Sequence, residues 1–537
     1  MPDTRVQGEL FRESGNSTRA PTGRRFIRQG LLSQARSGTE TTSGTRWPIS
    51  RIPLFLVPLP LPKLLLGPAA STGDGPVEAG DEGDEDHPDH RRATTSGQVD
   101  AVVGGLGCCQ DEGFHGGSTL RRPVARGPLS IEITFVRHGE TDANASSIWQ
   151  GQGDAALSEI GRKQAASLKV RLEAKHFDVV LSSDLRRTMQ TSELAGLEPV
   201  ADASWREMDI GDWEGLTRTE VQAQFPDEIN RLRSGDRDVA MGGGESWVEF
   251  GRRIDGALQR LVSETPTGSR VLVMAHGGVI HVALSARLGF RDKRPWPISR
   301  ILNAAVTEVV AGEDEFHLQV LNDARHAPVV TGDEDEHGMP IALIRHGETQ
   351  ANVEGRWHGR TDGPLTEHGL RQGAELATRF NGITRIFSSP LERTRRTAAA
   401  FAEPFDLAVD LAEGLIEIDF GAWEGLTTTE IGKRFPTEWH RVFRDGVDLP
   451  RGETGETFAE AGERMESQIR KLAEQNPTHR LGLFTHGGAI WALASRVMGV
   501  EWAGWRKMSI PGNTSITHIR FEGGAPVLLN YNLSGSR

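Results

Sequence analysis

The sequence contains very little cysteine, and its two cysteines are neighbours. Cys108 and Cys109 precede the regions that carry repeated motifs, so they cannot cross-link either core. This usage fits a reducing, cytoplasmic setting best. No basic start followed by an apolar core and a small-residue cleavage site opens the chain, so a standard secretory signal is not expected.

Long apolar runs are also lacking. The one candidate for a membrane span, "IPLFLVPLPLPKLLLG" at 52–67, is short, and four prolines and Lys63 interrupt it. We interpret it as an extended, polyproline-like piece and predict no membrane association.

An excess of positive charge is absent as well. The chain has 61 Lys and Arg against 74 Asp and Glu, a formal net charge of -13. This balance argues against broad binding of nucleic acids or anionic membranes, because both need a basic face. Any bound anion must therefore be held by local arginines. Nucleic-acid or membrane binding through the arginine-bearing segment 1–51 is a separate hypothesis that truncation would test.

Common metal and nucleotide motifs are missing too. The sequence has no HExxH, no P-loop and no paired CxxC, so the commonest zinc-binding and nucleotide-binding motifs are excluded. We predict no metal and no cofactor.

The chain divides into two kinds of sequence. Residues 1–129 are rich in Gly, Pro, Ser, Thr and Arg and show no sustained period, so we predict that they are disordered. From Ile131, short β-rich runs alternate with helical patterns, which is typical of a largely parallel α/β sheet. The expected strands are 131–136, 178–183, 270–275, 305–310 and 316–321, then 341–345, 385–389, 480–485, 515–520 and 526–531.

The ordered part is a tandem repeat. "TFVRHGET" at 134–141 returns as "ALIRHGET" at 342–349, and His346 follows His138 by 208 residues. Gly369 follows Gly161 by 208 and His486 follows His276 by 210, so a complete domain has been duplicated. We predict two three-layer α/β/α domains with mostly parallel central sheets, at 130–325 and 340–537, joined by a polar linker at 326–339.

Each half presents the same polar residues in the same order: an Arg-His pair, a second Arg, a Glu and a second His. They are Arg137, His138, Arg187, Glu207 and His276 in the first half, and Arg345, His346, Arg393, Glu417 and His486 in the second. Both histidines of a half directly follow an expected strand, at the end where open α/β sheets collect ligands.

This combination suggests phosphoryl transfer through a histidine. A neutral imidazole can attack phosphorus and form a covalent intermediate. Guanidinium groups bind phosphate oxygens in pairs and stay charged. A partly buried carboxyl group can remain protonated and give its proton to the departing oxygen. No metal is needed for this scheme.

The motifs resemble those of the histidine phosphatase, or phosphoglycerate mutase-like, superfamily over about 131–325 and 340–533. The resemblance implies that His138 and His346 are phosphorylated nucleophiles and that Glu207 and Glu417 donate protons. It implies phosphate pockets made by Arg137, Arg187 and His276, and by Arg345, Arg393 and His486. Asn144 and Asn352 match a phosphate-contacting position of the family. Glu214 and Glu424, in "WEG" triplets, fit packing or turn roles better.

The halves differ at a position where the family often has a basic residue near the substrate. The first half has Ile148 and the second has Arg356. We therefore expect different leaving-group preferences in two otherwise similar sites.

The function predicted from these observations is metal-independent hydrolysis of phosphomonoesters, with one site in each domain and a small phosphorylated metabolite as substrate. One alternative is phosphoglycerate mutase-type transfer, although "DIGDWEG" and "DFGAWEG" resemble the phosphatase branch more. Another is that one domain is a non-catalytic module that binds phospholigands.

Overall fold

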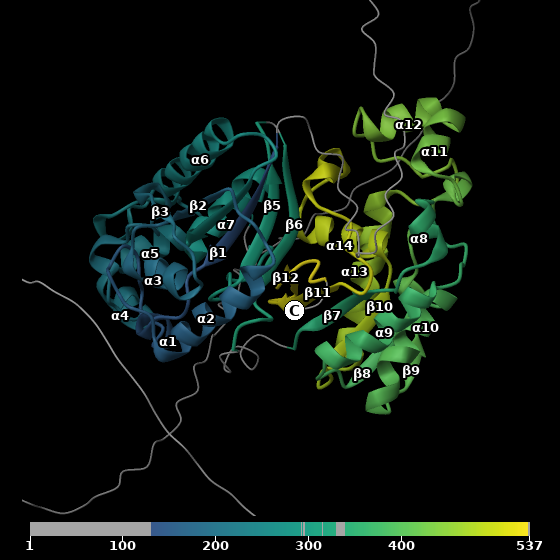
Figure 1. The fold of residues 1–537 in the computed structure, drawn as a ribbon, viewed down its shortest axis with the longest axis horizontal. Coiled ribbons are helices and arrows are strands. Elements are labelled where there is room, and N and C mark those ends of the chain that lie inside the picture. Colours follow the sequence, from purple (N-terminus) through teal and green to yellow (C-terminus); the bar gives the residue numbers. More distant parts are fainter. Residues whose placement is uncertain (1–129, 291–292, 294–295, 314, 329–338, 535–537) are drawn as a thin grey trace, which may run out of the picture. The chain divides into compact units, whose positions relative to one another are not determined.

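The computed structural model describes residues 130–534 except 291–292, 294–295, 314 and 329–338 (Figure 1). The segment predicted to be disordered, 1–129, lies outside the described residues, and with it the apolar run 52–67 and both cysteines. Most of the expected linker, 326–339, also lies outside them.

The first half of the described chain is built on a six-stranded sheet with the order β3-β2-β4-β1-β5-β6. Its strands are β1 (Ile131–Arg137), β2 (Val179–Ser182), β3 (Val200–Ala201), β4 (Arg270–Ala275), β5 (Val306–Ala311) and β6 (Phe316–Asp323). Strands β3, β2, β4 and β1 run parallel, whereas β5 and β6 add to β1 as antiparallel strands. The sheet is therefore mixed, with β1 and β4 at its centre.

The second half repeats this topology in the order β12-β11-β7-β10-β8-β9. Its strands are β7 (Ile341–Arg345), β8 (Arg385–Ser388), β9 (Val409–Leu411), β10 (Leu481–Thr485), β11 (Ile516–Glu522) and β12 (Ala525–Leu528). Strands β9, β8, β10 and β7 are parallel, and β11 and β12 are antiparallel. The two expected tandem α/β domains are confirmed.

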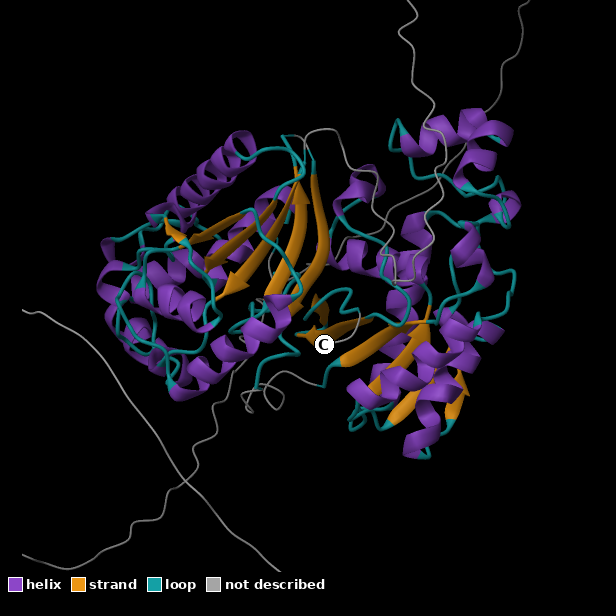
Figure 2. Cartoon of the chain, in the orientation of Figure 1, coloured by secondary structure: helices purple, strands orange, loops and turns teal. Residues whose placement is uncertain are grey.

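Helices flank both sheets (Figure 2). In the first half they are α1 (Asp142–Ala145), α2 (Glu159–Glu173), α3 (Arg186–Leu194), α4 (Arg218–Gln224), α5 (Pro226–Arg233), α6 (Trp247–Glu264) and α7 (Gly277–Leu288). In the second they are α8 (Gln350–Glu354), α9 (Glu367–Arg379), α10 (Glu392–Ala402), α11 (Thr428–Arg434), α12 (Pro436–Phe443), α13 (Phe458–Gln475) and α14 (Gly487–Met498). Helix α2 packs against α3 and α6 against α7, and the second half repeats both pairs.

Local sequence explains where the key helices begin. Thr141 caps α1 through the amide of Asn144, whose side chain accepts from the Thr141 amide in return. Thr349 and Asn352 form the same reciprocal cap at α8. These caps turn the chain sharply after each "RHGE" segment.

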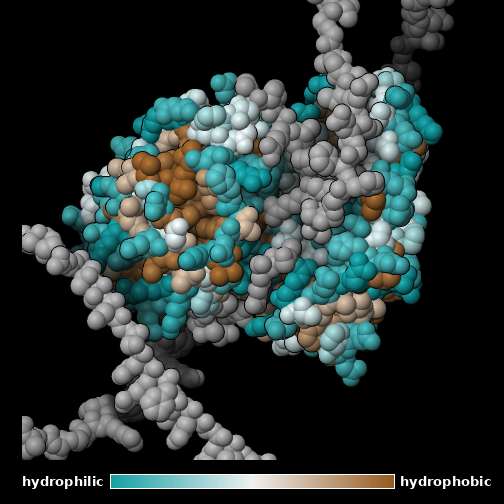
Figure 3. All heavy atoms as spheres, viewed as in Figure 1, coloured by the Kyte–Doolittle hydropathy of each residue, from teal (hydrophilic) through white to brown (hydrophobic). Residues whose placement is uncertain are grey.

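The central strands are buried on both faces, as parallel strands between helix layers must be. Phe135, Val273, Leu343 and Leu483 are almost inaccessible to solvent. The space-filling view shows a broad hydrophobic area on the first half, bordered by hydrophilic side chains, and a mainly hydrophilic surface on the visible part of the second half (Figure 3). The apolar residues therefore hold the strand ends rigidly in place.

Each half donates an equivalent hydrogen bond to the other half. Asn322 donates to the Leu529 carbonyl at 2.8 Å, and Asn532 donates to the Gln319 carbonyl at 2.8 Å. Asn532 follows Asn322 by 210 residues, the offset of the second histidines. The described residues of both halves fall in one compact unit. No helix among the described residues is long and apolar enough to cross a membrane.

Candidate active sites

Two histidines meet at the carboxyl end of each sheet. His138 follows β1, and His276 follows β4 as the N-cap of α7. Because β1 and β4 are adjacent parallel strands, their ends bring the two rings to 5.2 Å between centroids. His346 and His486 are placed in the same way after β7 and β10, with centroids 5.3 Å apart.

The first histidine of each pair has one ring nitrogen engaged. Nδ1 of His138 lies 2.6 Å from the carbonyl of Gly139, and Nδ1 of His346 lies 2.7 Å from the carbonyl of Gly347. A carbonyl oxygen only accepts, so Nδ1 must carry the proton. In a neutral imidazole, Nε2 then keeps its lone pair and can act as a nucleophile.

The second histidine of each pair is fixed by a serine. Nε2 of His276 lies 2.9 Å from Oγ of Ser183, and Nε2 of His486 lies 2.8 Å from Oγ of Ser389. In the first half, Nε of Arg187 also donates to Nδ1 of His276 at 3.2 Å. These contacts prevent the second ring from rotating.

Arg187 and Arg393 are buried and attached to a loop that borders the histidines. Arg187 donates to the carbonyls of Gly151 and Gly153 at 2.6 and 2.8 Å. Arg393 donates to the carbonyls of Gly359 and Thr361 at 2.6 and 3.0 Å. A buried cation held by neutral carbonyls is well placed to bind an anion.

The other arginine of each half is anchored from the opposite side. Nη1 of Arg137 donates to the Ile301 carbonyl, and Nη1 of Arg345 donates to the Pro511 carbonyl, each at 2.6 Å. Burial lowers the pKa of Arg137 to about 10, which leaves it charged at neutral pH.

Positive charge and burial keep the histidines neutral. Burial, followed by the charges of Arg187 and Arg137, lowers the pKa of His138 well below its usual value. Burial and Arg393 do the same for His346. The imidazoles of His138 and His346 are therefore neutral in the physiological pH range.

Each expected acid lies against the helix that follows the second histidine. Glu207 accepts from the amides of Met208 and Gly278, both at 3.0 Å. Glu417 accepts from Ile418 at 2.9 Å, Ala489 at 2.7 Å and Gly488 at 3.0 Å. Burial raises the pKa of Glu417 although these amides and Arg393 oppose it, so this carboxyl holds its proton more strongly than a free one.

The structure also places residues that sequence reasoning missed. Asn303 donates to the carbonyl of His138 at 3.1 Å and to Oδ1 of Asn144 at 3.2 Å. Asn513 repeats both contacts with His346 and Asn352, each at 3.1 Å. Asn144 and Asn352 are thus linked to the histidines through Asn303 and Asn513. The 210-residue spacing between Asn303 and Asn513 was the sequence signal that could have identified these two residues.

The glutamates of the "WEG" triplets hold the bordering loop. Glu214 accepts from the amides of Gly151 and Gly153 at 2.9 and 3.1 Å. Glu424 accepts from Arg360 at 2.7 Å and from Thr361 at 2.8 Å. Each glutamate therefore fixes the loop whose carbonyls hold the buried arginine.

Arg356 is engaged by acidic neighbours. Its guanidinium pairs with Glu354 at 2.9 Å and with Glu430 at 3.0 Å, and it donates to the carbonyl of Gly425. These contacts belong to the ends of α8 and α11. The expectation that Arg356 distinguishes the two sites thus has no direct support in the geometry.

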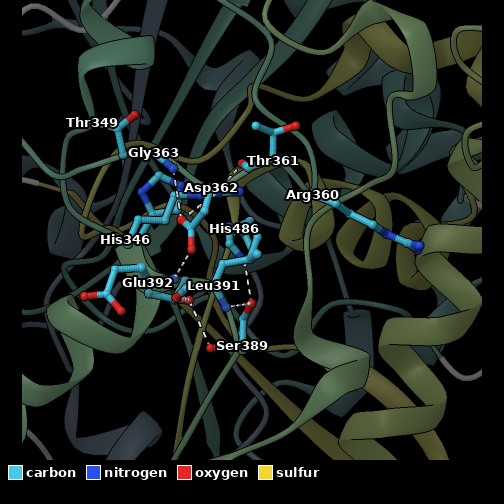
Figure 4. Close-up of polar contacts among 12 residues, drawn as sticks. His346, Thr349, Arg360, Thr361, Asp362, Gly363, Ser389, Leu391, Glu392 and His486 are labelled. Carbon is cyan, nitrogen blue, oxygen red and sulfur yellow. Dashed lines mark hydrogen bonds and ion pairs between the residues drawn. The ribbon is translucent and has the colours of Figure 1, made fainter.

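The halves differ more clearly in the bordering loop. In the first half, Arg206 pairs with Asp184 at 2.6 Å and donates to Gln152 at 3.3 Å. In the second, Arg360 occupies the position of Gln152 and pairs instead with Asp419 and Glu456 at 3.3 and 3.1 Å. Arg360 extends away from His346 and His486 (Figure 4).

The geometry defines a class of protein: a pair of α/β domains, each with two histidines, two arginines and a carboxyl group at the carboxyl ends of the parallel strands of a mixed sheet. The family model for the histidine phosphatase superfamily (branch 1) matches residues 133–324 and 341–534. The chain belongs to this superfamily, and its tandem duplication is confirmed.

Relatives with different activities align with about a third of this chain. A probable phosphoglycerate mutase of Cronobacter sakazakii is 34% identical over 186 residues, which cover 34% of this chain and 86% of that protein. A glucosyl-3-phosphoglycerate phosphatase of Mycobacterium tuberculosis is 36% identical over 189 residues, 33% of this chain and 84% of that protein. A crystal structure of a phosphoserine phosphatase from Entamoeba histolytica is 33% identical and covers 36% of this chain and 96% of that chain, with a TM-score of 0.34.

Proposed function

We propose that each domain hydrolyses phosphomonoesters through a phosphohistidine, so that the chain carries two active sites. The observation that carries this proposal is Nε2 of His138 and of His346, which has no hydrogen-bond partner among the described residues and belongs to a ring beside a second histidine. In each site the charge of a buried arginine, Arg187 or Arg393, also acts on this ring.

The first step forms the phosphoenzyme. The lone pair on Nε2 attacks phosphorus while the bond from phosphorus to the ester oxygen breaks. Glu207 or Glu417 gives its proton to that oxygen, which leaves as an alcohol. The arginines stabilise the negative charge of the phosphoryl oxygens as it shifts in the transition state.

The second step releases phosphate. The glutamate, now ionised, takes a proton from water, and the water oxygen attacks phosphorus. The bond from phosphorus to Nε2 breaks, and the imidazole returns to its neutral form with the proton on Nδ1. Histidine and glutamate are then ready for the next cycle.

We infer that the substrate is a small phosphorylated metabolite. This rests on the two arginines of each pocket and on relatives named for phosphoserine and for a glycosylated phosphoglycerate. A reducing, cytoplasmic setting is part of the same proposal.

Mutase-type transfer is the main rival, because relatives named as mutases are as similar as the phosphatases. The test is to incubate the full chain with 3-phosphoglycerate and with a panel of phosphomonoesters, measuring both free phosphate and 2-phosphoglycerate. Hydrolysis predicts release of phosphate. Efficient interconversion of the phosphoglycerates with little phosphate would overturn the proposal.

Trapping the intermediate tests the mechanism. Rapid alkaline quenching should recover a base-stable, acid-labile phosphoryl group on His138 and His346. Its absence from both peptides during turnover would exclude a phosphohistidine route.

A further inference from the structure

A third histidine is present in the second site and absent from the first. His358 lies in the loop whose carbonyls hold Arg393, and the equivalent residue, 208 positions earlier, is Gln150. The first loop therefore offers a neutral amide where the second offers a titratable ring.

Charged groups surround the ring of His358. A charge on His358 contributes to the lowered pKa of His346, after burial and the charges of Arg393 and Arg345. Asp362, from the same loop, lies 3.5 Å from Nη1 of Arg393 and accepts from the Glu392 amide. Figure 4 shows Asp362 and Gly363 in the same region as His346.

The chain makes room for this ring. A Cβ atom at Gly363 would lie 2.1 Å from Cε1 of His358, an impossible contact. The equivalent residue in the first half is Ala155, which has a Cβ and accompanies Gln150. The second half thus has His358 with Gly363, and the first half has Gln150 with Ala155. Only the second half leaves space for an imidazole at this position.

The ring also has unused hydrogen-bonding capacity. Nδ1 of His358 is buried without a hydrogen-bond partner. In the first half, by contrast, Gln150 accepts a hydrogen bond from Oγ1 of Thr141 at 2.9 Å. Among the described residues nothing therefore competes for Nδ1 of His358.

We propose that His358 is a specificity-determining contact for the phosphoryl group in the second site, and that its protonation makes this site, and not the first, bind dianions more tightly as the solution becomes more acidic. The proposal rests on the proposed function, because it assigns the phosphoryl group to the pocket beside His346.

The charges around the ring support this behaviour. Arg393 and burial disfavour its protonated form, whereas Glu424 and Asp362 favour it, and His346 beside it is kept neutral. Burial comes first among these causes and lowers the pKa of His358 in the ligand-free site. A dianion placed between Arg393 and His358 removes their repulsion and raises the pKa of His358, so binding and proton uptake reinforce each other.

Sulfate is a suitable probe because its charge is constant from about pH 5 to about pH 8, the range in which a histidine titrates. In the full chain with His138→Ala, which leaves turnover to the second site, the inhibition constant of sulfate should be about fivefold lower at the acidic end. Adding His358→Gln should remove this dependence while the enzyme still turns over.

Introducing the histidine into the first site tests whether the pH dependence comes from the imidazole or from a structural change. In the full chain with His346→Ala, Gln150→His together with Ala155→Gly should give the first site the pH dependence that it lacks. A dependence that survives His358→Gln would overturn the proposal and point to Asp362, Glu424 or the nucleophile.

Calorimetry separates this inference from the proposed function. Sulfate titrations in buffers of different ionisation enthalpy should show proton uptake in the His138→Ala protein and less in its His358→Gln derivative. If the second site has no turnover but this difference remains, the proposed catalytic role fails and the His358 contact stands. Equal proton uptake in the two proteins would refute the contact.

Discussion

At the scale of single residues, the two acids are less alike than their sequence positions suggest. Glu417 is buried and accepts from three backbone amides, whereas Glu207 is partly exposed and accepts from two. The raised pKa of Glu417 favours the protonated form that a leaving alcohol requires.

Replacing Glu417 should lower kcat most when the leaving group is poor. In the His138→Ala background, Glu417→Gln should lower kcat about 10²- to 10⁴-fold for an alkyl phosphate, the usual contribution of general acid catalysis. The loss should be much smaller for p-nitrophenyl phosphate, whose leaving group departs without a proton. Equal losses for the two esters, measured as steady-state kcat, would argue that Glu417 only supports the fold.

The buried histidines should make stability depend on pH. Burial lowers the pKa of His518 to about 4 in the folded protein, below its value in the unfolded chain. Between these two values the unfolded chain binds more protons, so the free energy of unfolding must fall as the pH falls below the unfolded pKa.

His518→Gln should reduce this slope by up to about 1.4 kcal/mol per pH unit, the contribution of one titrating group. Urea unfolding between about pH 5 and about pH 7 measures it. The exposed His176→Gln serves as the control. If His518→Gln has the same slope as the parent protein, the inference that burial lowers the pKa of His518 is wrong.

At the scale of elements, the start of helix α7 positions the acid of the first site. The Gly278 amide donates to Glu207, and a Cβ at Gly278 would lie 2.3 Å from its Oε1. Only glycine lets the carboxyl group approach the helix this closely.

Gly278→Ala should therefore displace Glu207 and lower first-site turnover at least as much as removing a general acid, about 10²-fold or more. Turnover is measured in the His346→Ala background. Gly256→Ala, inside α6, is the matched control, because its Cβ would meet nothing closer than 3.6 Å. The control should keep its activity and gain about 0.5–1 kcal/mol of stability. Full activity in Gly278→Ala would show that the contact is not needed.

The expected strands of the sequence correspond closely to the central strands, because buried parallel strands form continuous apolar runs such as "RVLVMA". The short edge strands β3 and β9 were missed, since two or three partly exposed residues carry no period. The recurring histidines, arginines and glutamates were found because their spacing repeats. Asn303 and Ser183 were missed because a single small polar residue looks like any loop or cap residue until the fold brings it to a histidine.

The partners of Arg356 could not be foreseen for a similar reason. Its sequence position is equivalent to Ile148, but its contacts depend on Glu430, which lies 74 residues further along the chain. Long-range ion pairs of this kind have no local signature.

At the scale of the whole molecule, duplication has preserved two complete residue sets on two sheets, and reciprocal hydrogen bonds join the two halves. Keeping buried arginines is costly unless an anion or another partner compensates them. Arg187 and Arg393 are both only 1% exposed. Retention of both favours an anion-binding pocket in each half, whether that half cleaves its ligand or only binds it.

Single and double replacements of the nucleophiles decide between these possibilities. His138→Ala and His346→Ala should each remove the turnover of one domain, and only the double variant should fall to background, measured as phosphate release over a panel of phosphomonoesters. Both histidines are buried, so the thermal unfolding of all three proteins is measured to establish that each is still folded. If either single variant alone loses all activity while still folded, one domain performs all the chemistry, and the other set of arginines must then be explained as a site that binds phosphate without cleaving it.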